Sequence, residues 1–220
     1  MDLAVKAGKL PPGDGMVTVK TEPIDVRASV VERVWQGMLI VSTLYLSWLL
    51  FMVFHEFGHV FGAWITHARV TGVKLGPHIV SETTIDPLQN PLPLVVVWAG
   101  PVLGIAIPLA IWDIFRRAIP DHAYLARFLA AFCLVANGAY IGADAFYRNG
   151  DGLVMIECGT PPWVMWVFGA VAAGCGLRLW HGLGQRFGLG QGRGRVDHAD
   201  TVIVCLLLIG VVLAELLIFS

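Results

Sequence analysis

Five long apolar segments constrain this chain more than any other feature. They cover residues 35–65, 92–114, 122–146, 162–180 and 201–219. A hydrocarbon core of about 30 Å needs about 20 apolar residues for one helix to cross it, and only a helix satisfies its own backbone there. Charged residues make up 14% of the chain, against about 25% in soluble domains. We therefore predict an all-α polytopic membrane protein with about five transmembrane helices.

The chain divides into three parts. Residues 1–34 form a polar N-terminal arm, residues 35–160 carry three of the helices, and residues 161–220 carry the last two. Residues 181–200, HGLGQRFGLGQGRGRVDHAD, join the last two helices and are rich in glycine, so we expect a flexible linker there.

Net charge and aromatic placement bear on the partners. The net charge is −1, and aromatic residues do not alternate with basic ones, so nucleic acid is not expected as a partner. The expected surroundings are a lipid bilayer, and the oligomeric state is left open. Four cysteines lie far apart without a CxxC pair, so we expect small buried residues instead of disulfides or metal ligands.

A polar stretch between the first two helices predicts a small β-hairpin beside the membrane, at about residues 69–85. Two β-branched runs, residues 68–75 and 78–85, flank the turn dipeptide Gly76-Pro77. Such a hairpin would lie at the membrane face.

The first apolar segment contains HEFGH, residues 55–59, which fits the pattern HExxH. In a helix this spacing places His55 and His59 on one face, about one turn apart, where both imidazoles can bind one Zn2+ ion. Zinc lowers the pKa of a water molecule toward about 7, and Glu56 would accept its proton as general base. Ionisable groups inside a membrane are costly, which favours a functional site. The alternative is a polar cluster satisfied by neighbouring helices or exposed at a helix end.

A catalytic zinc needs a third protein ligand, and two acids have other local partners. Asp113 lies beside Arg116 and Arg117 at the end of the second apolar segment, which indicates an interfacial charge cluster. Asp144 precedes Arg148 by four residues, which is the favourable spacing for an ion pair along a helix.

Asp151 is the third acid. It lies in Asn149-Gly150-Asp151-Gly152, where the glycines allow a sharp turn that could bring a short carboxylate close to another helix. A plain surface turn is the alternative.

Three segments together resemble the site-2 protease family of intramembrane zinc metalloproteases: HEFGHVFGAWITHARVTGVKLGP, WAGPVLG and NGDG. The resemblance covers roughly residues 45–155. It implies a three-helix core in which His55, His59 and Asp151 bind zinc and Glu56 is the general base. It also implies an enzyme, an endopeptidase that cuts within or next to a transmembrane segment of another membrane protein.

One departure from the family concerns substrate binding. Family members often carry an asparagine shortly after Gly-Pro, but GPVLGIAIP has none. Asn137 in the third helix either takes this role or forms a hydrogen bond between helices. The GxxxG spacing of Gly100 and Gly104 predicts close helix packing.

The predicted hairpin has two interpretations. In the family it is linked to presenting substrate as an added strand, and an exposed strand edge would replace the hydrogen bonds of an unwound helix. Residues 69–75, with Val70 and Val73, are then the candidate edge. The alternative is a structural cover over the first helix.

Membrane orientation is left open. Twelve of the fifteen Lys and Arg residues fall on the N-terminal side of alternating helices, so the positive-inside rule places the N-terminus in the cytoplasm and the hairpin outside. The family places its zinc and hairpin toward the cytoplasm. We expect a multi-pass protein of the cell (inner) membrane.

Two other functions fit part of the pattern. A metal-ion transporter would also use histidine and glutamate on a transmembrane helix. Transporters usually show repeated, interrupted helices and further intramembrane ligands, whereas here the polar groups gather at one site. A non-catalytic regulatory relative of the protease is the other alternative, against which the intact HExxH argues.

Overall fold

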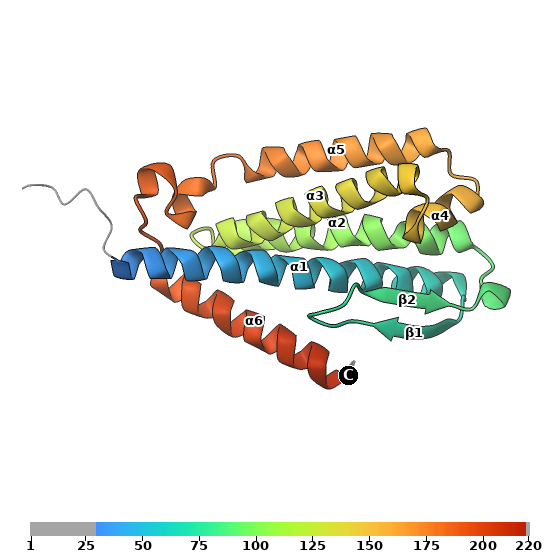
Figure 1. Ribbon diagram of the computed structural model, residues 1–220, viewed down its shortest axis with the longest axis horizontal. Coiled ribbons are helices and arrows are strands. Elements are labelled where there is room, and N and C mark those ends of the chain that lie inside the picture. Colours follow the sequence, from blue (N-terminus) through green and yellow to red (C-terminus); the bar gives the residue numbers. More distant parts are fainter. Residues whose placement is uncertain (1–29, 219–220) are drawn as a thin grey trace, which may run out of the picture.

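The computed structural model describes residues 30–218 and shows a bundle of long helices with a two-stranded hairpin at one end (Figure 1). The helices are α1 (Val30–Thr66), α2 (Pro93–Ala118), α3 (Ala123–Tyr147), α4 (Gly150–Glu157), α5 (Pro162–Trp180) and α6 (His198–Ile218). All except the short α4 are long and apolar enough to cross a membrane. The predicted all-α polytopic fold is confirmed.

Helix α1 is longer than its sequence predicts. Its described part begins at Val30 and has 37 residues, a length of about 55 Å at 1.5 Å per residue. Residues 30–34, assigned above to the polar arm, therefore belong to this helix. Residues 1–29 of the predicted arm lie outside the described part of the chain. Because the helix exceeds the bilayer core of about 30 Å, it either tilts or extends beyond the hydrocarbon.

Small residues set the closest helix contacts. A Cβ on Gly58 of α1 would overlap the carbonyl of Ala99 in α2, and a Cβ on Gly138 of α3 would lie 2.8 Å from the carbonyl oxygen of Gly169 in α5. Backbones approach this closely only where side chains are minimal. The α1–α2 and α3–α5 pairs thereby form the two closely packed contacts of the bundle.

The predicted hairpin is present. Strand β1 (Val70–Lys74) pairs antiparallel with β2 (Glu82–Ile85), and its connecting loop lies against α1, where the Tyr45 hydroxyl donates to the Pro77 carbonyl at 3.0 Å. In Figure 1, β2 is the strand nearer to the helices and β1 the outer one.

The expectation of a flexible linker at residues 181–200 is wrong. Short 3-10 turns at Gly184–Phe187 and Gly190–Gly192 fold this segment into a cap, at the end of the bundle opposite the hairpin (Figure 1). Leu183 and Phe187 are buried in the core, and the Gln36 side-chain amide donates to the Phe187 carbonyl at 3.0 Å. Burial of the apolar side chains between the glycines stabilises one conformation of the segment, and glycine content alone does not predict this.

Candidate metal centre

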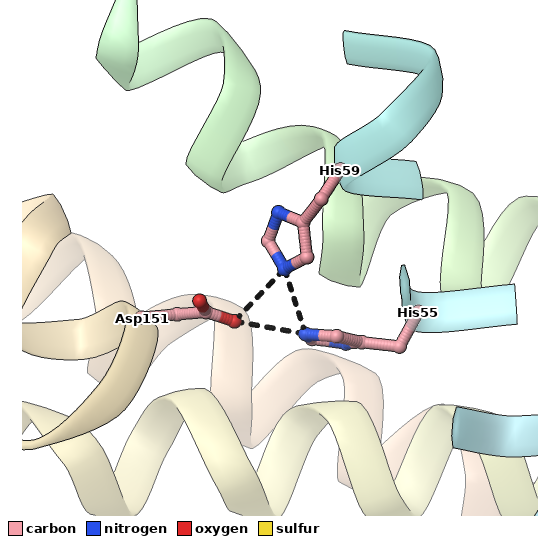
Figure 2. Close-up of side chains that lie close together, drawn as sticks. All are labelled: His55, His59 and Asp151. Atoms are coloured by element: carbon pink, nitrogen blue, oxygen red, sulfur yellow. Dashed lines mark hydrogen bonds and ion pairs between the residues drawn. The ribbon is translucent and has the colours of Figure 1, made fainter. Parts of the chain in front are cut away.

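Three side chains meet beside the cavity that residues 80–85 of the hairpin line, and Figure 2 shows how they point toward one another. His55 and His59 lie one turn apart on α1, and their Nε2 atoms are 3.1 Å apart. Oδ2 of Asp151, from the start of α4, lies 2.8 Å from Nε2 of His55 and 3.2 Å from Nε2 of His59. The structure thus brings together the three residues predicted as metal ligands, although His59 and Asp151 are 92 positions apart in the sequence.

The arrangement fits a zinc ion. Zinc takes imidazole nitrogen and carboxylate oxygen at about 2.0–2.2 Å, and a catalytic site keeps three protein ligands with a fourth position open. In a tetrahedral site such bonds place neighbouring ligand atoms about 3.4 Å apart, slightly more than the 2.8–3.2 Å here. A small outward movement of the side chains would accommodate the ion.

Neighbouring helices orient both imidazoles through their other nitrogen. Nδ1 of His55 lies 2.8 Å from Oδ1 of Asn137, and Nδ1 of His59 lies 3.0 Å from the Val96 carbonyl oxygen. The Asn137 amide nitrogen donates to the Cys133 carbonyl at 2.9 Å, so its oxygen is left to accept. Both Nδ1 atoms therefore carry a proton, and in the neutral imidazoles both Nε2 atoms direct a lone pair toward Asp151.

Asn137 thus forms the hydrogen bond between helices that was one of its two expected roles. It is fully buried and does not line the cavity over the centre, so its position does not fit direct contact with substrate. Sequence reasoning did not connect it to His55, because the two residues lie 82 positions apart.

The glycines of the GxxxG spacing make room for this centre. A Cβ on Gly100 would overlap the imidazole ring of His59, and one on Gly104 would lie 3.0 Å from the Asn137 amide. Their role therefore extends beyond the helix packing predicted from the sequence.

Helix α3 holds Asp151 in place through the start of α4. The Asp151 backbone N–H donates to the Tyr140 hydroxyl, and the Gly152 N–H donates to Oδ2 of Asp144, both at 3.2 Å. A Cβ on Gly150, whose φ is +50°, would lie 2.5 Å from the Tyr140 hydroxyl, and one on Gly152 would overlap the Asp144 side chain. The two glycines are therefore required for α4 to approach α3.

The ion pair predicted between Asp144 and Arg148 is wrong. Asp144 faces α4, while Arg148 is exposed in the left-handed conformation that ends α3. The hydrogen bond that Asp144 accepts from the Gly152 N–H forms in place of the ion pair that the helical spacing favoured. Asp113 does pair with Arg116 and Arg117, as predicted.

The carboxyl group of Asp151 responds to the charge of the two imidazoles. Burial by itself would raise its pKa, but when the imidazoles carry a second proton on Nε2, their hydrogen bonds and charge outweigh burial and hold the pKa below its ordinary value. An ionised carboxylate is the form that binds a metal.

Glu56 is buried beside the two histidines, and the hairpin holds it. The Ser81 hydroxyl donates to one carboxylate oxygen at 2.7 Å, and the Thr83 hydroxyl donates to the other at 2.6 Å. Sequence reasoning missed both hydroxyls. The two residues are two positions apart in a predicted strand and therefore lie on one face of it, and this pattern could have indicated that they act together.

A cavity of about 1130 Å³ opens over the centre and is lined by His55, Glu56 and His59, by residues 80–85, and by Asp151. Val70 and Val73 do not line it. Val73 instead packs on a core cluster with Leu49 and Met52 of α1, as a structural cover would. The strand bordering the cavity is β2.

No family model, curated protein or solved structure matches this chain. The geometry of the centre and its cavity is therefore what indicates a function.

Proposed function

We propose that the protein is an intramembrane zinc metalloendopeptidase of the site-2 protease type, resident in the cell membrane. It would hydrolyse a peptide bond within or next to a transmembrane segment of a membrane-protein substrate. The observation that carries the proposal is the convergence of Nε2 of His55, Nε2 of His59 and Oδ2 of Asp151, with a buried glutamate next to them in the chain.

The three converging atoms are all hydrogen-bond acceptors once each Nδ1 keeps its proton. When both imidazoles are neutral, two bare nitrogens and a carboxylate oxygen within 3.2 Å of one another repel, and a cation between them would replace this repulsion with attraction. Two imidazoles and one carboxylate are a ligand set of catalytic zinc sites.

The residues of the chain then have distinct roles. Bound zinc would supply Lewis-acid activation of water and of the scissile carbonyl. Glu56 would accept the proton of the attacking water and deliver it to the amine that leaves. Asn137 and Val96 would keep the imidazoles in the correct tautomer.

The cavity suits an extended peptide. A helical peptide bond is shielded by its own hydrogen bonds, so a transmembrane substrate must unwind before it is cut. Strand β2 borders the cavity, and β1 pairs with only one of its edges. An unwound substrate segment would add to the other edge of β2, a change from the β1 edge at Val70 and Val73 predicted above.

The test compares wild type with Glu56→Gln in liposomes that also contain membrane-protein extract. Both proteins should retain about one zinc per chain, and new N-termini found by mass spectrometry should appear only with wild type. Asp113→Asn, at the opposite end of α2, is the matched control and should cleave normally.

Other outcomes would contradict the proposal. Equal cleavage by Glu56→Gln would exclude this residue as the base. Zinc flux into the liposomes without any cleavage would favour a metal-ion transporter. Absence of both activities, with zinc retained, would favour a non-catalytic regulatory relative.

A further inference from the structure

We propose that Ser81 and Thr83 are positioning residues for Glu56, so that the hairpin sets the general base of the centre. This inference rests on the proposed function, because it assigns a role within the same reaction. The two hydroxyls donate to different carboxylate oxygens of Glu56 at 2.7 and 2.6 Å. No other hydrogen-bond donor contacts this carboxylate among the residues that the structure describes.

Two donors are needed because Glu56 belongs to a helix and has a long side chain. Three rotatable bonds separate its carboxylate from the backbone, and a buried carboxylate without partners is costly. One hydrogen bond would leave the carboxylate free to rotate about that contact. A donor on each oxygen fixes both the position and the plane of the group.

The two hydrogen bonds to Glu56 leave its carboxylate able to act as a general base. An ionised carboxylate has about four lone-pair sites, and the two hydroxyls occupy one on each oxygen. The remaining sites can accept a proton from water in the cavity, which Glu56 lines. Hydroxyls that donate to both oxygens therefore orient the group without blocking it.

The hairpin links this contact to substrate. Ser81 and Thr83 are two positions apart, so their side chains share the face of the strand that meets α1. Glu82 and Thr84 alternate with them and are exposed. A substrate strand on the free edge of β2 would order the same backbone that carries the two hydroxyls, and would thereby fix Glu56 when substrate is present.

The experiment measures binding of a leucine-containing peptide hydroxamate to the zinc-loaded protein by calorimetry. A hydroxamate chelates zinc and gives its proton to a neighbouring carboxylate, so its affinity reports the placement of Glu56. The variants are Ser81→Ala, Thr83→Val and the double variant, with Glu56→Gln as reference. Zinc content is measured for each.

We expect the double variant to keep its zinc and to bind the hydroxamate about tenfold more weakly, the lower end of effects for residues that orient a metal site. Glu56→Gln should weaken binding at least as much. Thr83→Ser keeps the hydroxyl and should bind like wild type. Thr71→Val removes a hydroxyl of β1 that donates to the Thr84 carbonyl and does not contact Glu56; it is the matched control and should also bind like wild type.

Each contrary outcome has its own meaning. If Glu56→Gln weakens binding and the double variant does not, the hydroxyls do not position the base. If the double variant binds more tightly than wild type, the hairpin restrains Glu56 and the inference is overturned. If wild type holds no zinc, the proposed function itself fails, and this result is distinct from the other two.

Discussion

Two His–Asp clusters lie at opposite ends of this bundle, and they differ in their supply of hydrogen-bond donors. At the cap end, Asp200 of α6 accepts from Nδ1 of His122 at 2.6 Å and from the Tyr124 hydroxyl at 2.8 Å. At the hairpin end, Asp151 meets two imidazoles whose donor nitrogens are bonded elsewhere. The carboxylate of the first cluster has a donor on each oxygen, and under the proposed function a zinc ion would complete the second.

The comparison separates a structural role from a chemical one for similar residues. Asp200 is 2% exposed, and each of its oxygens has a donor, so it fixes the start of α6 against α3. Asp151 is held by backbone contacts with α3, which leave its Oδ2 to face the imidazoles. A buried carboxylate therefore indicates a site only after its donors have been counted.

The largest expected effect is loss of the metal. His59→Ala and Asp151→Ala each remove one of three ligands, so the purified proteins should retain almost no zinc after desalting, against about one per chain in wild type. Atomic absorption measures this. Asp200→Ala should retain zinc like wild type. Loss of zinc from this variant would contradict the separation of the two clusters.

The second effect concerns stability at the cap end. Asp200→Ala leaves the buried Tyr124 hydroxyl without its acceptor, and hydrogen bonds to a charged group contribute about 1.5–3 kcal/mol each. The free energy of unfolding in detergent should fall by about 2–3 kcal/mol. An unchanged unfolding midpoint would show that the cluster does not anchor α6.

The third effect tests how His55 is oriented. Asn137→Leu removes the acceptor for Nδ1 of His55, and loss of such a partner typically weakens metal affinity about 10–100-fold. Competition with a chelator measures the affinity. Asn137→Asp keeps an acceptor oxygen and should lose less, and equal losses in both variants would point to packing instead.

The smallest effect concerns the support of Asp151. Tyr140→Phe removes the hydroxyl that accepts the Asp151 N–H, and a neutral hydrogen bond contributes about 0.5–1.5 kcal/mol. Zinc affinity should therefore fall only a few-fold. The control is Tyr147→Phe, since Tyr147 is 80% exposed; a similar loss there would contradict a specific role for Tyr140.

Features that depend on residues close together in the sequence could be predicted from the sequence alone. Apolar segment length located the five long helices, and the β-branched runs located the hairpin. The four-residue spacing of His55 and His59 placed them one turn apart. Asp151 was weighed as a ligand from its glycine turn alone, and resemblance to a family favoured it. No local rule predicted α4, because eight residues between two loops carry little periodic signal.

The errors share one cause. Asp144 had a favourable partner four residues away, but the start of α4 offered a buried N–H that the helical rule does not consider. Residues 181–200 read as a flexible linker because glycine content was weighed and the burial of Leu183 and Phe187 was not. In both cases a tertiary contact outweighed a local preference.

The sequence by itself determined which segments are helical, where the hairpin forms and which two histidines share a helix face, because these depend on spacing along the chain. Only the tertiary structure decided that Asp151 meets those histidines, that Asn137 and Val96 direct their lone pairs, and that β2 holds Glu56. These contacts join residues 27 to 96 positions apart. Their geometry follows from how closely the glycine-lined helices pack, which no local pattern encodes.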